Sequence, residues 1–348
     1  MRKHTWIFGT ICSILLSIGQ SAAQSFTYVS VDVPCSAFPS GTACPATGYA
    51  VATVANGINP GGDIVGNYTD GNNTSHGFLL RDGQFSTIDV DFPWAAFTIG
   101  AYGISPGGDI VGRYRAKPNT TADPNSAQYC DGTAACIKGF LYHLGKFSTV
   151  LYAGHPGAFA QRITADGDIY GCLHNHNTGN SMFGAAWRRS GNISLIAGEG
   201  ELTDPTFGLP MSMNNGATPD GSTIVGFYTD MATPPHTHGF IVQNSFLQQP
   251  AWAACYDISG TPCYDVPLST LTQIWDVNSG QQFVGTYKDS SGHQHGFLQL
   301  PGGSAPIQLD YPGASATIAF GINPDSVIVG QYSANGNVHG FAAVPATE

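Results

Sequence analysis

The stretch "GINPGGDIVGNYTDGNNTSHGF", residues 57–78, decides the fold, because the chain repeats it near its other end. Residues 321–341 read "GINPDSVIVGQYSANGNVHGF", and four looser versions lie between these two. Each version centres on the glycine of "IVG" or a close variant, and we number the repeats 1 to 6 by these glycines. They are Gly66, Gly112, Gly171, Gly226, Gly285 and Gly330. A repeat of about 45 to 60 residues indicates a propeller or a solenoid.

One repeat contains four short segments that read as strands. In repeat 1 these are "ATVANGI", "DIVGNYT", "HGFLLR" and "QFSTIDV", separated by the turn "NPGG", a polar tip and the turn "DG". Turn residues between β-branched and aromatic runs are typical of antiparallel hairpins. Four antiparallel strands per repeat make a propeller blade. The sequence therefore predicts an all-β, six-bladed β-propeller.

The two ends of the chain predict how the ring closes. Repeat 6 stops after "HGFAAVPATE" and lacks a fourth strand. The segment "SFTYVSVDVP" near the N-terminus resembles "QFSTIDVDFP" of repeat 1, which aligns Phe26 with Phe85 and Asp32 with Asp91. We expect this segment to complete the last blade, since a ring closed in this way has no open sheet edge. Residues 24–348 then form a single domain.

The first 23 residues have the features of a secretion signal. Arg2 and Lys3 precede the apolar run "WIFGTICSILLSIG", and small residues ending at Ala23 suit a cleavage site. The run is shorter than the ~20 residues that span a membrane. We expect residues 1–23 to be removed, no membrane span, and a secreted or periplasmic protein.

Charge and composition exclude several classes of function. The chain has 12 Lys and Arg against 23 Asp and Glu, a formal net charge of −11, and no basic cluster. Such a surface does not suit nucleic acid. The sequence contains no phosphate-binding loop, nucleophile elbow or zinc-protease motif, and it leaves the cofactor unknown. We expect a monomer.

Six cysteines fall in three close pairs along the chain. Each pair brackets a polar insertion rich in Gly, Pro or Ser, as expected of disulfide-stapled loops in an oxidising compartment. Six cysteines allow fifteen connectivities, so pairing by proximity is an interpretation. No pair has the CxxC spacing of a zinc site. The predicted disulfides join Cys35 to Cys44, Cys130 to Cys136 and Cys255 to Cys263.

The repeat text resembles a known family. "G-I-N-x-x-G-x-I-V-G-x-Y" followed by "H-G-F" is similar to the bacterial extracellular HAF repeats, with HGF mostly in place of HAF. The resemblance covers essentially all of the chain after residue 23. It implies a secreted β-propeller and no particular activity.

The long connections belong to one face of the predicted ring. Turns within the first and second hairpins of a blade are short, whereas second-to-third strand and blade-to-blade connections are long. Loops on a rigid scaffold carry function, so we predict the working surface on this face, over the channel mouth. The alternative is that these loops are only tolerated insertions. The long connections are residues 35–49, 115–137, 197–210, 229–237 and 249–271.

The inner strands predict which side chains line the channel. At the repeat's first glycine, Arg162 and Asp276 replace glycine in repeats 3 and 5. Opposite charges where the pattern prefers glycine favour either function or an ion pair between them. The residues that precede this glycine, one in each repeat, form a candidate binding ring around the channel. Its aromatic members suit either a platform for a sugar or packing between blades. The ring is Asn56, Tyr102, Gln161, Asn215, Trp275 and Phe320.

Two groups of histidines raise the question of a metal. In repeat 3, Cys172, His174 and His176 alternate and could offer a soft metal three ligands. Residues at i, i+2 and i+4 on a strand spread over ~13 Å, so we favour a buried free thiol with two loop histidines over a metal site. The histidines of "HGF" stand two strands from the axis, and three face an aspartate across the hairpin tip. We interpret these as structural Asp–His pairs. They are His76, His238, His295 and His339, with Asp70, Asp230 and Asp289.

Two functions fit these observations best. The first is a binder of an extracellular glycan or protein through the looped face. The alternative is a carbohydrate-active enzyme at the channel mouth. A hydrolase needs two carboxylates, which Asp276 and a loop acid could supply, and a lyase needs a base and a cation, such as Tyr102 and Arg162. A third possibility is a part of a larger extracellular complex. The loop acids are Glu199, Glu201 and Asp204.

Overall fold

The fold was analysed on a computed structural model, which shows an all-β protein. The only helix among the residues it describes is one 3-10 turn, η1 (Cys35–Ala37), and no helix among them could cross a membrane. The predicted signal, the Cys130–Cys136 pair, His176 and the three loop acids lie outside the described residues. The structure describes residues 24–117, 137–150, 157–175, 181–190, 193–195, 211–230, 232–243, 246–247, 255–256, 262–303 and 305–346.

Repeats 1 and 2 each form a separate four-stranded antiparallel sheet, as the turn pattern predicts. Within each sheet the strands follow chain order from the axis outward. The sheet of repeat 1 contains β2 (Ala52–Ile58), β3 (Ile64–Thr69), β4 (Ser75–Arg81) and β5 (Gln84–Ile88). The sheet of repeat 2 contains β6 (Ala95–Ile104), β7 (Ile110–Ala116), β8 (Ile137–His143) and β9 (Lys146–Val150).

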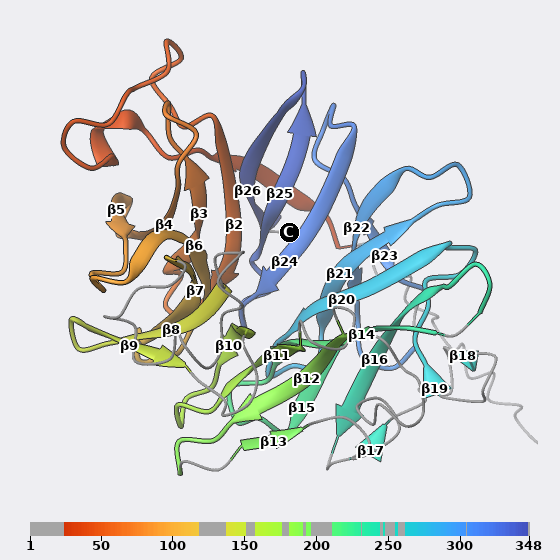
Figure 1. The fold of residues 1–348 in the computed structure, drawn as a ribbon. Helices are drawn as coiled ribbons and strands as arrows, with labels where there is room; N and C mark the ends of the chain where they lie inside the picture. Colours follow the sequence, from red (N-terminus) through yellow and green to blue (C-terminus); the bar gives the residue numbers. More distant parts are fainter. Residues whose placement is uncertain are drawn as a thin grey trace, which may run out of the picture.

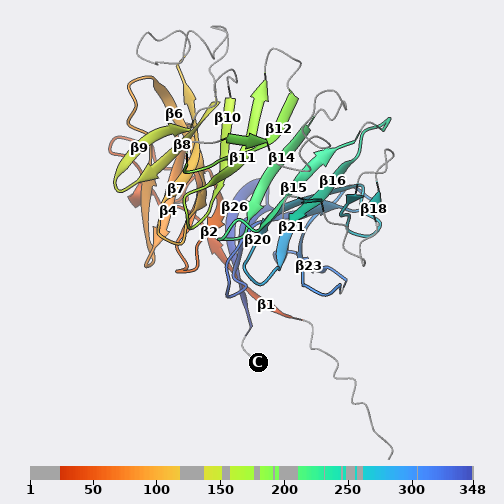
Figure 2. The same cartoon turned by 90° about the horizontal axis from the view of Figure 1, so that it is seen from below.

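Repeat 6 is completed by the N-terminal strand. Strand β1 (Phe26–Val31) pairs antiparallel with β26 (Asn337–Pro345), outside β25 (Ile328–Ala334) and β24 (Ala316–Ile322). Figure 2 shows β1 beside the C-terminal strands. The predicted closure is therefore confirmed.

The alignment that we used for the closure is wrong by two residues. Val31 pairs with Gly340 as Ile88 pairs with Gly77, so Asp32 is equivalent to Asp89 and not to Asp91. A shift of two residues keeps every side chain on the same face of a strand, so the hydrophobic pattern alone does not distinguish the two registers.

The middle of the chain departs from the prediction of six separate sheets. Repeats 3, 4 and 5 share one twelve-stranded sheet, so the part of the chain that the structure describes forms four main sheets and a small hairpin. Single parallel pairs, Met182 with Met211 and Thr237 with Leu271, join the third strand of one repeat to the inner strand of the next. These two bridges are the reason why three repeats form one sheet and not three. All repeats still follow one another around a common centre (Figure 1).

The shared sheet contains three consecutive sets of antiparallel strands. Repeat 3 supplies β10 (Gly157–Ile163), β11 (Ile169–Asn175), β12 (Ser181–Trp187) and β13 (Ile193–Leu195). Repeat 4 supplies β14 (Met211–Ala217), β15 (Thr223–Thr229), β16 (Thr237–Gln243) and β17 (Phe246–Leu247). Repeat 5 supplies β20 (Leu271–Val277), β21 (Phe283–Lys288), β22 (Gln294–Gln299) and β23 (Ile307–Leu309). The hairpin is β18 (Cys255–Tyr256) with β19 (Pro262–Cys263).

Close packing explains why "IVG" and "HGF" recur together. Gly66 lies directly opposite Phe78 in the β3–β4 pair, and Phe78 is fully buried. A Cβ on Gly66 would lie 2.5 Å from the Phe78 ring and 2.0 Å from the carbonyl oxygen of Val54. The glycine therefore leaves the space that the phenylalanine fills, which is a common reason for glycine inside a strand.

Candidate functional site

A β-bulge orients the predicted channel ring in every repeat. In each inner strand the register with the second strand shifts across one residue, for example between Ala55 and Gly57. The skipped residue is in all six cases the predicted ring residue: Asn56, Tyr102, Gln161, Asn215, Trp275 and Phe320. Bulges commonly redirect a side chain next to a functional site. The sequence identified the ring but not the bulge that forms it.

The amide side chains of the ring join neighbouring repeats. Asn56 Nδ2 donates to the carbonyl oxygen of Ala101 in repeat 2, at 2.9 Å. Asn215 Nδ2 donates in the same way to Ile274 of repeat 5, at 2.8 Å. Gln161 Oε1 accepts a hydrogen bond from Arg113 of repeat 2. All three amides are buried, so they hold the ring together rather than face solvent.

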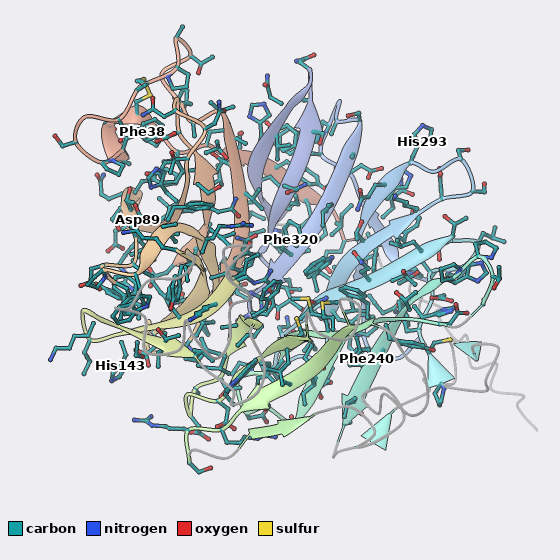
Figure 3. All side chains as sticks on the ribbon, viewed as in Figure 1. Phe38, Asp89, His143, Phe240, His293 and Phe320 are labelled. Carbon is teal, nitrogen blue, oxygen red and sulfur yellow. A yellow bond between two sulfur atoms is a disulfide. The ribbon has the colours of Figure 1, made fainter. Side chains whose placement is uncertain are left out.

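The aromatic members of the ring are only partly buried. Trp275 and Phe320 meet edge to face with centroids 4.9 Å apart, and Phe227 packs on Trp275 at 6.1 Å. Figure 3 places Phe320 near the centre of the ring. On the other side, the Arg113 guanidinium lies 4.1 Å from the centroid of the Tyr102 ring. The ring thus presents aromatic surface at the side of the channel nearer the long loops.

An ion pair closes the channel one residue beyond the ring. Its two members come from the inner strands of repeats 3 and 5. Arg162 Nε donates to Asp276 Oδ1 at 3.0 Å, and both side chains are 8% exposed. The rest of the guanidinium donates to the carbonyl oxygens of Asn56, Tyr102 and Phe320. Arg162 therefore binds four other repeats at once, and the ion-pair alternative of the sequence analysis is the one that the structure contains.

The carboxylate of the pair is enclosed as completely as the guanidinium. Asp276 Oδ2 accepts the backbone N–H of Ile322 at 3.1 Å. Burial raises the pKa of Asp276 above its usual range, although Arg162 and the Ile322 N–H oppose the shift. Without these partners the buried charge would be very unfavourable.

In two of the four remaining repeats, glycine at this level leaves room for the side chains of the pair. A Cβ on Gly57 would lie 2.8 Å from Arg162 Nη1, and a Cβ on Gly216 would lie 2.9 Å from Asp276 Oδ1. A side chain at either position would push against the ion pair. The repeat's first glycine is therefore complementary to the two charged replacements.

A small cavity lies on the other side of the pair, at the mouth formed by short turns. Its volume is about 40 Å³, which holds a few water molecules at most. Arg162 and Asp276 form its floor, and Pro60 and Pro106 of the first-to-second strand turns stand at its rim. The wall is mixed: the polar residues Asn278, Ser279 and Asn323 line it together with the apolar residues Ile58, Ile104, Ile163, Ala217, Val277 and Ile322. We predicted the working surface at the opposite mouth, beside the long connections.

The first long loop folds over a hairpin tip on the looped face. Cys35 and Cys44 form a disulfide within residues 35–49. The Gly71 N–H, at the tip of repeat 1, donates to Ala43 of this loop at 3.1 Å, and Phe38 stacks on Tyr68. This loop therefore has a defined conformation on the repeat beneath it.

Of the other two predicted disulfides, one is partly described. Cys263 is disulfide-bonded, and the β18–β19 hairpin pairs it with Cys255.

Cys172 is part of the core. Its thiol is fully buried against Met182, Met213 and Phe227, and burial raises the pKa of Cys172 to about 12. A metal ligand needs the thiolate, which this environment disfavours. The side chains of His174 and His176 lie outside the described residues.

Three of the four recurring histidines are held between two carboxylates, and His339 has one. His76 Nε2 lies 3.2 Å from Asp70 Oδ2, as predicted, and Nδ1 lies 2.7 Å from Asp89. The equivalent residue of Asp89 binds Nδ1 of the other three: Asp265 for His238, Asp310 for His295 and Asp32 for His339. The sequence analysis missed these second aspartates, although Asp89, Asp310 and Asp32 each directly follow an outer strand.

Comparison with known proteins gives likenesses of fold only. No family model matches the sequence, and no curated protein does. Among solved structures, a Trypanosoma rangeli sialidase in complex with sialic acid is 9% identical, with a TM-score of 0.45; 92% of this chain spans 59% of the sialidase.

Two other propellers are similar to the same extent. The β-propeller domain of the trilobed protease from Pyrococcus furiosus has 9% identity, a TM-score of 0.43 and coverage of 86% of this chain and 97% of that one. The Aleuria aurantia lectin in complex with Fucα1-6GlcNAc has 12% identity, a TM-score of 0.40 and coverage of 85% and 96%.

Proposed function

We propose that this chain is a secreted glycan-binding propeller of the HAF-repeat type, with six blades. The six-blade count takes the twelve-stranded sheet as three blades joined by two bridges. Residues 1–23 would direct secretion, and the folded domain would act as a monomer. The ligand would be an extracellular glycan that approaches the looped face, where the bulged ring lies below the long connections.

The observation that carries this proposal is that the axial residues Arg162 and Asp276 are occupied by partners within the ring. Catalysis at the channel mouth would need Arg162 or Asp276 to reach a substrate, but each is bound to partners within the ring. The groups left toward the looped face are the aromatic rings of Tyr102, Trp275 and Phe320, which are only partly buried. Partly exposed aromatic side chains suit the apolar face of a sugar.

The test is a glycan-binding screen with the chain from Gln24 onward, followed by titration of any ligand found. We expect Trp275→Ala to weaken binding about tenfold or more, a loss of about 1.4 kcal/mol. Leu144→Ala is the matched control, since Leu144 is 85% exposed in a short turn of repeat 2. Equal loss in both variants, or binding only to a protein partner, would contradict the proposal.

The same glycans test the enzyme alternative. Reducing ends and unsaturated uronate products should not accumulate with the unaltered chain over a day. If either product forms, and Arg162→Met abolishes it while the variant stays folded, the channel is catalytic and the binding proposal is wrong.

A further inference from the structure

Two arginines of repeat 2 stand near the looped face. Arg113 and Arg115 alternate on β7, so their side chains lie on the same face of that strand. After Ala116 the chain enters the long connection between the second and third strands, so this end of β7 lies at the looped face. The side chains of both arginines are only partly buried.

These two arginines lack the carboxylate partner that other arginines of the chain have. Three arginines each form an ion pair with an aspartate: Arg81 with Asp63, Arg162 with Asp276 and Arg188 with Asp168. Neither Arg113 nor Arg115 forms an ion pair with a residue that the structure describes, and Nε of each is buried without a hydrogen-bond partner there. A buried donor without an acceptor is unfavourable, and more so when it belongs to a charged group. This part of the molecule is therefore short of acceptor oxygen atoms.

Arg113 is held in place by aromatic rings and one amide. Its guanidinium carbon lies 4.1 Å from the centroid of the Tyr102 ring and 4.3 Å from that of Phe159. Phe159 belongs to β10 of repeat 3, which packs against β7 (Figure 1). Nη2 donates to Oε1 of Gln161 in the same strand. Aromatic rings attract a cation through their faces but supply no acceptor oxygen, so the guanidinium is oriented without being neutralised.

Arg115 lies one step closer to the looped face. Its guanidinium carbon is 5.9 Å from the centroid of the Phe97 ring, near the outer limit of a cation–π contact. Its guanidinium donates to no group among the described residues. Arginine is weakly hydrated for a cation, and its planar fork matches the oxygen atoms of a carboxylate or a sulfate. The two neighbouring forks therefore suit an anionic group that arrives from the looped face.

The repeat pattern shows that the fold does not need a charge at the position of Arg113. This residue follows the glycine of "IVG", and in repeat 1 the equivalent Asn67 accepts a hydrogen bond from Asn56 within the same repeat. The equivalent residues of the other five repeats are all uncharged. They are Asn67, Cys172, Phe227, Thr286 and Gln331.

We propose that Arg113 and Arg115 bind an anionic group of the glycan, either a uronate carboxylate or a sulfate ester, beside the ring of Tyr102. This inference rests on the proposed glycan-binding function and names the class of glycan as acidic. The apolar face of a sugar packs on the aromatic ring while terminal nitrogens of the arginines donate to the anionic oxygens. Because the chain has a net charge of −11, its overall field repels an acidic polymer, and the arginines determine where the polymer binds.

The test compares the charged and uncharged forms of the same polymer on the chain from Gln24 onward. The probes are polygalacturonate with its methyl ester, and dextran sulfate with dextran. We expect the charged form to bind at least tenfold more tightly in one of the two pairs, and that pair distinguishes a carboxylate from a sulfate ester. The preference should shrink as the salt concentration rises.

Arginine variants locate the anion. Arg113→Gln and Arg115→Gln should each weaken binding of the charged polymer about tenfold and leave binding of the uncharged form unchanged. Arg189→Gln is the matched control, because Arg189 is exposed on the opposite face, in the short turn between β12 and β13. Denaturant unfolding shows which variants are folded. Arg115→Gln keeps the test valid if Arg113→Gln is unstable, since Arg115 has no hydrogen bond to a described residue.

The possible outcomes separate this inference from the proposed function. Equal affinity for the charged and uncharged forms in both pairs overturns the acidic class and leaves glycan binding intact. An equal loss in Arg189→Gln, or unchanged binding of the charged polymer in folded Arg115→Gln, overturns the assignment to these arginines. If the chain binds no glycan of either kind, the proposed function is wrong and this inference is wrong with it.

Discussion

The axial ion pair and the His–Asp tip of repeat 5 lie at very different depths. Arg162 and Asp276 are each 8% exposed and serve the whole ring. At the tip of repeat 5, His295 and its two aspartates are 20%, 34% and 38% exposed, and the motif recurs along the rim. The comparison shows that the buried axial pair serves the ring, whereas the tip of repeat 5 is open to solvent. The tips of repeats 1 and 4 are closed, since His76 and His238 are each 10% exposed beside aspartates that are 4% and 1% exposed.

The largest effect should come from breaking the axial pair. Arg162→Met leaves Asp276 buried without its countercharge, and we expect a loss of about 3–5 kcal/mol in the free energy of unfolding. Denaturant unfolding measures this. Arg81→Met removes an exposed Arg–Asp pair with Asp63 and should cost only about 0–1 kcal/mol. Similar losses of unfolding free energy in the two variants would mean that burial does not make the axial pair more important for stability than the exposed pair.

A smaller effect should follow from crowding the axial pair while leaving its charges intact. Gly57→Ala puts a Cβ 2.8 Å from both Arg162 Nη1 and the carbonyl oxygen of Tyr102. We expect destabilisation of about 1–3 kcal/mol, as for other overpacked sites. Gly107→Ala is the control, because its Cβ would meet only Ser105 Oγ at 3.7 Å. If Gly57→Ala is as stable as the control, the glycines do not complement the pair.

The smallest effect should come from the repeat 1 tip, and it should depend on pH. Burial opposes protonation of His76, yet Asp89 and Asp70 outweigh it and raise the pKa of His76 above 6.5. A raised pKa means that the protonated form stabilises the fold. This contribution is complete below about pH 6.5 and is lost as the pH rises through the folded pKa.

His76→Gln should therefore cost more in acid than in base. We expect about 2 kcal/mol at pH 5.5 and about 1 kcal/mol at pH 9, from charged and neutral hydrogen bonds respectively. Unfolding at the two pH values, on both proteins, gives the difference. A larger cost at pH 9 would show that His76 is neutral in the folded protein.

The sequence predicted the architecture because turn chemistry and strand periodicity repeat. The ring residues were found for the same reason, since Trp275 and Phe320 occupy equivalent places in their repeats. The two-residue register of β1 was not predictable, because both registers bury the same face. The bridges that join repeats 3 to 5 also lay beyond prediction, since each depends on one backbone pair.

The aspartates that bind Nδ1 of the recurring histidines could be recognised only from the strand pairing in the structure. Asp89 and Asp310 are far from their histidines along the chain, and only the strand register brings them to Nδ1. A signal was available, because an aspartate follows the outer strand in repeats 1, 5 and 6. The repeat pattern predicted a closed ring, and in such a ring Arg162 and Asp276 can meet. The sequence therefore offered their ion pair as one of two interpretations.

The most direct test of the account is a double-mutant cycle at the axis, with Arg162→Met, Asp276→Asn and the double variant compared by denaturant unfolding. The account predicts that the double variant is more stable than the sum of the single losses requires, by about 2 kcal/mol, because removing both charges relieves the penalty of leaving one buried. Additivity within about 0.5 kcal/mol would contradict a structural pair and return both side chains to the list of groups available for chemistry.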